Sequence, residues 1–191
     1  MEKILDLRQE IYQQFHGSRA GPDFFFLSEN KNEYAAYYTA MYLIQDTGEA
    51  VWWHMGQGFS SEPMHAYIEF WGVLQAICIQ QDAIDELHKA VIGSRPGRVE
   101  DCAWKKIRDL RIRCAGHPAN RSRDVPGPQR TFLGRRFGNY NAIKYELWDS
   151  SNSGISHPVV DLRTMIDQYD DEAAQILTEV LSAMKSRWPC P

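Results

Sequence analysis

The residues best suited to chemistry are Arg111 and His117, which lie six positions apart in the segment RIRCAGHP. An imidazole titrates near neutral pH and can move a proton, whereas a guanidinium holds phosphate oxygens in a planar fork. Together they suit phosphodiester chemistry, in which charge develops on phosphate oxygens in the transition state. Arg111 and His117 are therefore the candidate catalytic pair.

Positive charge is concentrated around this pair. Between Trp104 and Arg136 the chain has ten Lys or Arg residues and two acids, a net charge of +8, whereas the whole chain carries −4. Such a concentration is typical of surfaces that bind phosphate or nucleic acid, although a solvated charged helix has the same composition. The candidate substrate-binding residues are the polar and cationic side chains of this segment: Arg108, Arg113, Asn120, Arg121 and Arg123.

A helix is expected over residues 99–115, and its end would position His117. Gly116 suits the left-handed conformation that commonly follows a helix, and the proline after His117 cannot continue one. His117 would then lie at the C-terminal mouth, where the helix dipole stabilises a charged imidazole. Arg113 shares its face, while Arg111 is about 120° away on an ideal helix and meets the histidine only if the helix end unwinds.

The order of Arg111, five residues and then His-Pro, with Gly116 before the histidine, resembles the signature of the HEPN superfamily, the higher eukaryote and prokaryote nucleotide-binding domains. Further similarity extends loosely over Glu69–Glu86 and the last thirty residues. Families of this kind are bundles of four or five helices that often dimerise. Many are metal-independent endoribonucleases of toxin–antitoxin or phage-defence systems, in which the signature Arg and His of two protomers face each other across a shared cleft.

The resemblance implies that Arg111 is the signature arginine and His117 the signature histidine. It implies an RNA-cutting enzyme that forms a homodimer, with a nucleotidyltransferase-type antitoxin as a candidate partner. The residue after the signature arginine is usually polar in these families, and here it is Ile112. The alternative is therefore a catalytically silent helical module that binds nucleotide, RNA or a partner protein through the same basic surface.

Other chemistries have less support. Glu62–His65 and Asp85–His88 have the i, i+3 spacing of di-iron bundles, but on one helix the two histidines would be about 35 Å apart and could not share an ion. The chain has no Gly-x-Ser-x-Gly elbow, P-loop or Rossmann fingerprint. We therefore expect neither a metal ion nor a cofactor.

Apolar residues at helical spacing predict the elements that must position the site. Long helices are expected over residues 2–16, from residue 31 onward with an interruption at Thr47-Gly48, over Met64–Ile92 and over Val160–Trp188. The first half of Met64–Ile92 is apolar almost all round, which is typical of a helix buried centrally in a bundle. Its polar residues would then need partners: Gln75, Gln80, Gln81 and Asp82.

Residues 130–148 have strand character rather than helical periodicity. Arg130–Phe137 and Ala142–Trp148 flank a turn at residues 138–141, which predicts a small β-hairpin. The expected fold class is thus mainly α, an up-and-down bundle of four or five helices that is HEPN-like, with this hairpin inserted before the C-terminal helix. The cationic helix would turn an apolar face to the core or to a second protomer: Val99, Ala103, Ile107, Leu110 and Cys114.

Composition bounds the remaining possibilities. A chain of 191 residues with 43% hydrophobic residues is expected to form one domain over residues 1–191. No apolar run approaches the roughly 20 residues of a membrane span, and the charged N-terminus is unlike a signal peptide. Four cysteines without framework spacing favour reduced thiols in a cytoplasmic protein. The aromatic residues between Tyr34 and Trp53 are expected in the core or an interface rather than in base stacking.

Overall fold

The computed structural model of the chain describes residues 1–121, 127–151 and 154–191. Over these ranges the chain is mainly helical, and short strands lie between the last two helices. The expectation of a helical chain with a small β region before the C-terminal helix is confirmed. The helices are α1 (Glu2–Gly17), α2 (Ala20–Phe26), α3 (Lys31–Gln57), α4 (Pro63–Ile92), α5 (Ala103–Arg111) and α6 (Leu162–Arg187).

Successive long helices run in opposite directions. Glu2 at the start of α1 contacts Trp52 near the end of α3, whereas Phe15 at the end of α1 packs on Tyr37, so these helices are antiparallel. The chain then turns through residues 58–62 into α4, which packs along α3. This alternation is what short connections between long helices produce, because each helix must return past the previous one to bury its apolar face.

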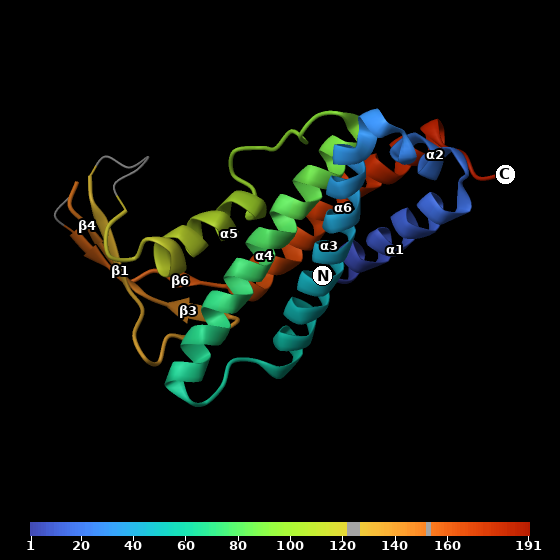
Figure 1. Cartoon of the computed structure of the whole chain (residues 1–191). Coiled ribbons are helices and arrows are strands. Elements are labelled where there is room, and N and C mark those ends of the chain that lie inside the picture. Colours follow the sequence, from blue (N-terminus) through green and yellow to red (C-terminus); the bar gives the residue numbers. More distant parts are fainter. Residues whose placement is uncertain (122–126, 152–153) are drawn as a thin grey trace.

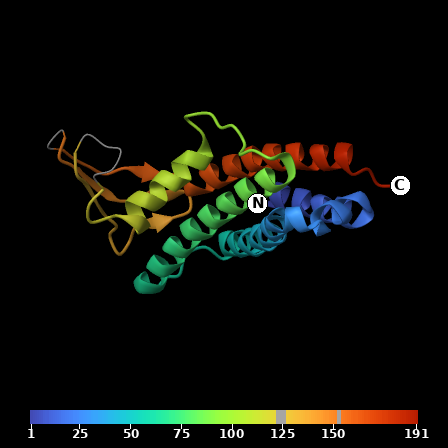
Figure 2. The same cartoon turned by 45° about the horizontal axis from the view of Figure 1, so that its top comes forward.

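α5 continues the alternation. Gln81 of α4 donates to the carbonyl of Trp104 near the start of α5, while the earlier Gln75 bonds Arg111 at its end, so α4 and α5 are antiparallel. α6 then returns through the molecule and packs against α1, α4 and α5. Figures 1 and 2 show the strands gathered at one end of this helical body, beside α5, and α2 with the C-terminus at the other end.

α4 is the central helix, as expected, because it packs against α3, α5 and α6. Most of its buried polar groups bond to neighbouring helices, although the side-chain oxygen of Gln81 has no partner in the described chain. Gln80 donates to the carbonyl of Ile44 at 3.1 Å and accepts from the Tyr169 hydroxyl at 3.0 Å, while the Gln81 amide donates to the carbonyl of Trp104 at 3.1 Å. These bonds fix the register of four helices around one core, since an unpaired buried amide would be costly.

The strands form two small antiparallel sheets, which corrects the expectation of a single hairpin. The strand predicted over residues 142–148 is interrupted at Tyr145, which is buried and whose N–H donates to the carbonyl of Pro158. The interruption divides the predicted strand pair into two short pairs, and each pair gains a third strand from the segment before α6. One sheet is β1 (Gln129–Phe132), β4 (Glu146–Asp149) and β5 (Gly154–Ser156), and the other is β2 (Gly138–Asn139), β3 (Ala142–Lys144) and β6 (Val159–Val160).

Three further boundaries differ from the sequence-based expectations. The segment between the first two predicted helices contains a further short helix, α2, which begins at Ala20. The predicted interruption at Gly48 is absent, since α3 continues through it and Leu5 of α1 approaches the glycine so closely that a Cβ would lie 2.9 Å from its side chain. Residues 159–160 form β6 instead of helix, and α6 begins at Leu162.

α5 begins at Ala103 and not at Val99, because its N-terminal cap comes from another helix. The Glu172 carboxylate of α6 accepts hydrogen bonds from the backbone N–H groups of Ala103 at 2.8 Å and Trp104 at 2.9 Å. A carboxylate at this position satisfies free N–H groups and complements the helix dipole. The capping residue lies far along the chain and has no local signature.

Candidate functional site

The end of α5 is not the predicted glycine cap but a wider, π-helical turn over Ile112–Gly116. Gly116 does not adopt a positive φ, so the expectation of a left-handed glycine at this position is wrong. The turn closes through a backbone hydrogen bond of 2.8 Å from the N–H of His117 to the carbonyl of Ile112. π-helical turns are rare and frequently occur at functional sites.

Arg111 is held by a neutral partner. Its Nε and Nη2 atoms donate to the side-chain oxygen of Gln75 at 3.0 and 2.9 Å. Its Nη1 atom lies against Gly116, where a Cβ would come within 3.1 Å of it. Among the described residues no carboxylate pairs with Arg111, so the guanidinium keeps its full positive charge next to the residue that precedes His117.

His117 is exposed, and its ring makes no hydrogen bond or ion pair with the described part of the chain. The other five histidines differ in surroundings: His54, His65, His88 and His157 each have a carboxylate within ion-pair distance, and His16 packs on aromatic rings. The His117 imidazole is therefore free to exchange protons with a bound molecule, which is what general acid–base catalysis requires.

The predicted substrate-binding residues differ in their partners and exposure. Arg108 pairs with Asp82 of α4, and both Arg113 (2.8 Å) and Arg121 (2.5 Å) pair with Asp109. Asn120 is exposed beside Arg121, and Arg123 lies outside the described residues. The structure thus brings Arg111 next to the turn that carries His117, but it ties the other three described arginines into ion pairs.

The positive charge of this segment is smaller than the count over residues 104–136 indicates. Lys105 pairs with Glu100 at 2.5 Å and Lys106 with Asp101 at 3.0 Å, and both acids lie just upstream of that window. Among the described residues of the segment 104–136, the cations that have no carboxylate partner are Arg111 and the exposed Arg130, Arg135 and Arg136. The uncompensated charge therefore lies at the end of α5 and on the strand region, not along α5 itself.

An exposed sheet face adjoins the His117 turn. The N–H of Thr131 in β1 donates to the carbonyl of Pro118 at 2.8 Å, which anchors the loop after His117 to this strand. Arg130 and Phe132 flank Thr131, and Arg130 is the register partner of Trp148 in β4. Cross-strand partners project from the same face, so Arg130, Phe132 (64% exposed) and Trp148 (49% exposed) share one surface.

The interior of the turn is inert. Cys114 is buried, and burial raises the pKa of its thiol to about 12. Burial also raises the pKa of the Tyr145 hydroxyl, with Arg113 opposing that shift through its charge and a hydrogen bond. Both groups therefore keep their protons near neutral pH.

Two residues that control this site were not among the predicted site residues. Gln75 orients Arg111, and Asp109 neutralises two arginines. Gln75 was detectable in part, since a polar residue on an otherwise apolar helix needs a partner. Asp109 was also detectable in part, since Arg113 lies four residues later on the same helical face. Its second partner, Arg121, lies twelve residues away and reaches Asp109 only through the loop that follows His117.

Most of the apolar face predicted for α5 is part of the core of the chain. Val99 precedes the helix and is exposed, whereas the remaining residues are buried within the chain: Ala103, Ile107, Leu110 and Cys114. A different apolar stripe is exposed on α4, at Met64, Ile68 and Trp71. Helical spacing continues this stripe to Gln75, the residue that holds Arg111.

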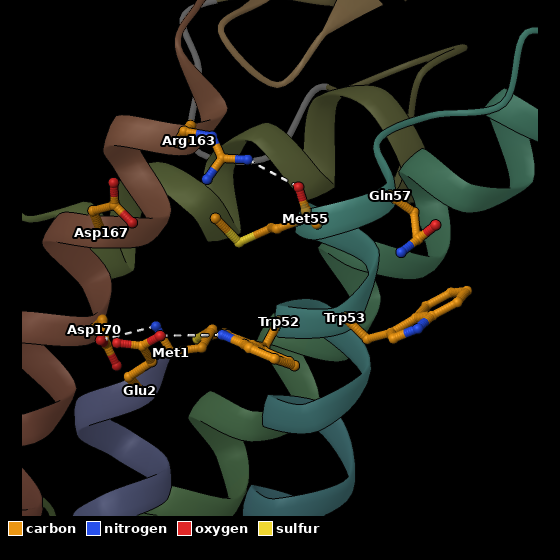
Figure 3. A pocket seen from close by; sticks show the side chains of 10 residues that line it. Met1, Glu2, Trp52, Trp53, Met55, Gln57, Arg163, Asp167 and Asp170 are labelled. Atoms are coloured by element: carbon orange, nitrogen blue, oxygen red, sulfur yellow. Dashed lines mark hydrogen bonds and ion pairs between the residues drawn. The ribbon is translucent and has the colours of Figure 1, made fainter.

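A separate cavity of about 680 Å³ lies between the end of α3 and the start of α6, and none of the predicted site residues lines it. Figure 3 shows that most of its charged groups bond to their neighbours, whereas Asp167 is drawn without a partner. The N-terminal amine of Met1 pairs with Asp170 at 2.8 Å, and Arg163 donates to the carbonyl of Met55 at 2.9 Å. Charges of both signs line this cavity, so its chemistry favours no particular ligand.

Two general properties concern the described residues. No three or more His, Cys, Asp or Glu side chains are grouped in a way that could hold a metal ion. None of the helices in this part of the chain has the length and apolar character needed to cross a membrane.

Comparison with known proteins gave no match: no protein-family model, no curated protein and no solved structure is significantly similar to this chain.

Proposed function

We propose that the chain binds RNA and cleaves it without a metal ion, with Arg111 and His117 as the catalytic pair. One observation carries this proposal. An exposed imidazole with no partner in the described chain follows directly on Gly116, against which an arginine without a carboxylate partner is packed. A structural ion pair would bury or neutralise these groups, whereas a phosphodiester site needs both of them available.

The proposed chemistry uses a nucleophile that RNA carries. His117 removes the proton from a ribose 2′-hydroxyl, the 2′ oxygen forms a bond to phosphorus, and the bond from phosphorus to the 5′ oxygen breaks. Arg111 stabilises the charge that develops on the non-bridging phosphate oxygens. The products are a 2′,3′-cyclic phosphate and a 5′-hydroxyl, and a second acid group protonates the leaving oxygen.

The sheet face beside the turn supports binding of single-stranded RNA. Bases stack on exposed aromatic rings while cations contact the backbone, and such stacking tolerates many sequences. Trp148 and Phe132 supply the rings, and Arg130 on the same face supplies the charge. A strand that crosses this face would pass the loop that joins Pro118 to β1 and so approach His117.

The family assignment and assembly belong to the same proposal. The alternating directions of α1, α3, α4, α5 and α6 support an up-and-down, HEPN-like bundle. A second copy of the chain would cover the apolar stripe at Met64, Ile68 and Trp71, and would bring two Arg111 residues close to one interface. The proposed setting is a cytoplasmic toxin–antitoxin or phage-defence system, with a nucleotidyltransferase-type antitoxin as the partner.

Cleavage of labelled single-stranded RNA in EDTA tests the activity. Wild-type protein should produce cyclic-phosphate ends, and His117→Ala and Arg111→Ala should each reduce the rate by about 10²-fold or more. His157→Ala is the matched control, because His157 also precedes a proline and is exposed but pairs with Glu146. Equal loss in this control, or cleavage that depends on added metal ions, would contradict the assignment.

RNA affinity tests the binding surface separately. Trp148→Ala should weaken binding by about tenfold, because stacking one base on an aromatic ring contributes about 1–3 kcal/mol. Trp53→Ala removes an indole that is 61% exposed on α3 and should leave the affinity unchanged.

Ile112 keeps a second candidate function open, a catalytically silent module that binds nucleotide, RNA or a partner protein. An isoleucine side chain can neither orient His117 nor bond to phosphate. If the wild-type protein binds RNA but does not cleave it, this alternative is favoured over the ribonuclease.

A further inference from the structure

The guanidinium of Arg8 in α1 is a buried charge without a counter-ion. The residue is 9% exposed, and no carboxylate lies within ion-pair distance of it in the described ranges. Its Nε donates to the carbonyl of Met41 in α3 at 3.0 Å, and its Nη1 lies 3.5 Å from the side-chain oxygen of Gln9. Its Cζ atom also lies 5.3 Å from the centroid of the Tyr12 ring, a cation–π contact, but the remaining N–H donors have no hydrogen-bond partner among the described residues.

Buried charges elsewhere in the described chain are paired. The amine of Met1 pairs with Asp170, and Arg98 pairs with Asp85, with all four groups largely shielded from water. This is the expected pattern, because an unpaired buried ion is costly. Arg8 departs from it, so its position calls for an anion that the chain itself does not supply.

Arg8 lines a cavity of about 380 Å³ between α1 and α3. Tyrosines are half of the residues that line it. Tyr12 and Tyr37 come from the two facing helices, and Tyr38 and Tyr42, each 51% exposed, lie at the rim. A volume of this size suits a small organic molecule, and aromatic walls favour a flat apolar one. No acidic residue lines the cavity.

Tyr37 provides a second, independent sign of a missing ligand. It is 4% exposed, yet its hydroxyl has no hydrogen-bond partner in the described chain. Buried hydroxyl groups are normally bonded. Burial raises the pKa of Tyr37 well above its usual range, so the hydroxyl keeps its proton and is available as a donor.

We propose that this cavity binds a small aromatic carboxylate, with its carboxylate on Arg8 and Tyr37 and its ring against Tyr38 and Tyr42, whose own rings pack on each other at 4.9 Å. The two oxygens of a carboxylate match the free donors of the guanidinium fork and one hydroxyl. A phosphate monoester brings more charge and a third oxygen than this donor set can satisfy. The site is independent of the basic surface at α5, since it lies between α1 and α3.

Calorimetric titration with 2-naphthoate tests the site, with 2-naphthamide and 2-naphthyl phosphate as probes of equal ring size. The carboxylate should bind about tenfold or more tightly than the neutral amide, because a charge-assisted hydrogen bond is stronger than a neutral one. It should also bind about tenfold or more tightly than the phosphate, whose extra charge and third oxygen would lack donors in this site. Absence of binding at millimolar naphthoate, equal binding of the amide, or preference for the phosphate would each overturn the proposal.

Variants locate the binding. Arg8→Gln should weaken naphthoate binding by about tenfold or more, and Tyr42→Ala should weaken it at the rim without loss of fold. Trp53→Ala, an exposed aromatic on the same helix that does not line this cavity, should have no effect. If circular dichroism shows that Arg8→Gln does not fold, the comparison of Tyr42→Ala with Trp53→Ala decides. Equal naphthoate affinity of these two variants would mean that the ligand binds elsewhere and would overturn the proposal.

Discussion

The backbone carbonyl of Ile112 accepts a hydrogen bond of 2.8 Å from the backbone N–H of His117. This bond spans five residues and closes the π-helical turn at the end of α5. Because it involves main-chain atoms only, an isoleucine can make it as well as a polar residue can. The apolar residue after Arg111 is therefore compatible with the observed placement of His117. What Ile112 lacks is only a polar side chain that could bond to phosphate or to the imidazole.

Ile112→Asn is expected to raise cleavage without disturbing the turn. An amide next to Arg111 can bond to phosphate or to the His117 ring, and one such hydrogen bond in the transition state contributes up to about 10²-fold in rate. Single-turnover cleavage in EDTA measures the effect, and Ile112→Val is the control because it keeps the position apolar. If Ile112→Asn binds RNA but remains as inactive as Ile112→Val, the silent-module alternative is favoured.

Gln75→Glu is expected to weaken RNA binding by neutralising Arg111. The new carboxylate would occupy the position of the amide oxygen that now accepts from Nε and Nη2. Loss of one phosphate contact should reduce the slope of log affinity against log salt by about 0.7 for single-stranded RNA. Gln57→Glu changes the net charge equally at an exposed position outside the site. If both variants shift the slope alike, Arg111 makes no specific phosphate contact.

Trp71→Glu tests the proposed second protomer. Light scattering of the wild type at micromolar concentration should give twice the 22.1 kDa mass of one chain. A carboxylate at the Trp71 end of the apolar stripe on α4 should produce monomers, whereas Trp53→Glu on α3 should remain dimeric. A wild-type particle of a single chain mass would remove any site shared between two protomers.

Local sequence signals predicted those parts of the structure that local physics determines. The periodicity of α4 placed its ends within a residue of Pro63 and Ile92, since a helix with a wide apolar stripe needs only its own pattern to be recognised. The mainly helical fold and the β region before α6 followed for the same reason.

Parts that depend on distant partners were not predictable. α5 begins at Ala103 because Glu172 caps it from α6, and its π-helical end is anchored where Thr131 bonds the carbonyl of Pro118. The charge of the basic segment was overestimated for a related reason. Acids outside the counted residues 104–136, such as Asp82, pair with the basic side chains of this segment through contacts that only the folded chain makes.

Asp109 is the residue whose removal should strengthen the basic surface. Its two carboxylate oxygens pair with Arg113 at 2.8 Å and Arg121 at 2.5 Å, so both guanidinium groups are withheld from any phosphate. Asp109→Asn would release them while keeping the size of the side chain. We expect tighter RNA binding and a salt slope steeper by about 0.7 for each arginine that then contacts the backbone.

The same substitution should lower the stability of the fold. Arg113 and Arg121 are partly buried, and loss of their shared carboxylate leaves two desolvated charges with weaker partners. Because Asp109 itself is about one third exposed, the expected loss is only about 1–2 kcal/mol in the free energy of unfolding. Urea denaturation measures this loss, and filter binding at several salt concentrations measures the affinity.

Asp167→Asn is the control for Asp109→Asn, since it makes the same change in net charge at an exposed position on α6. Tighter binding in Asp109→Asn alone would show that RNA lies across the arginines at the end of α5. Equal binding in both variants and the wild type would mean that Arg113 and Arg121 do not touch RNA even when released. The charged segment around α5 would then be a solvated face, and the RNA path would have to be sought on the sheet beside Trp148.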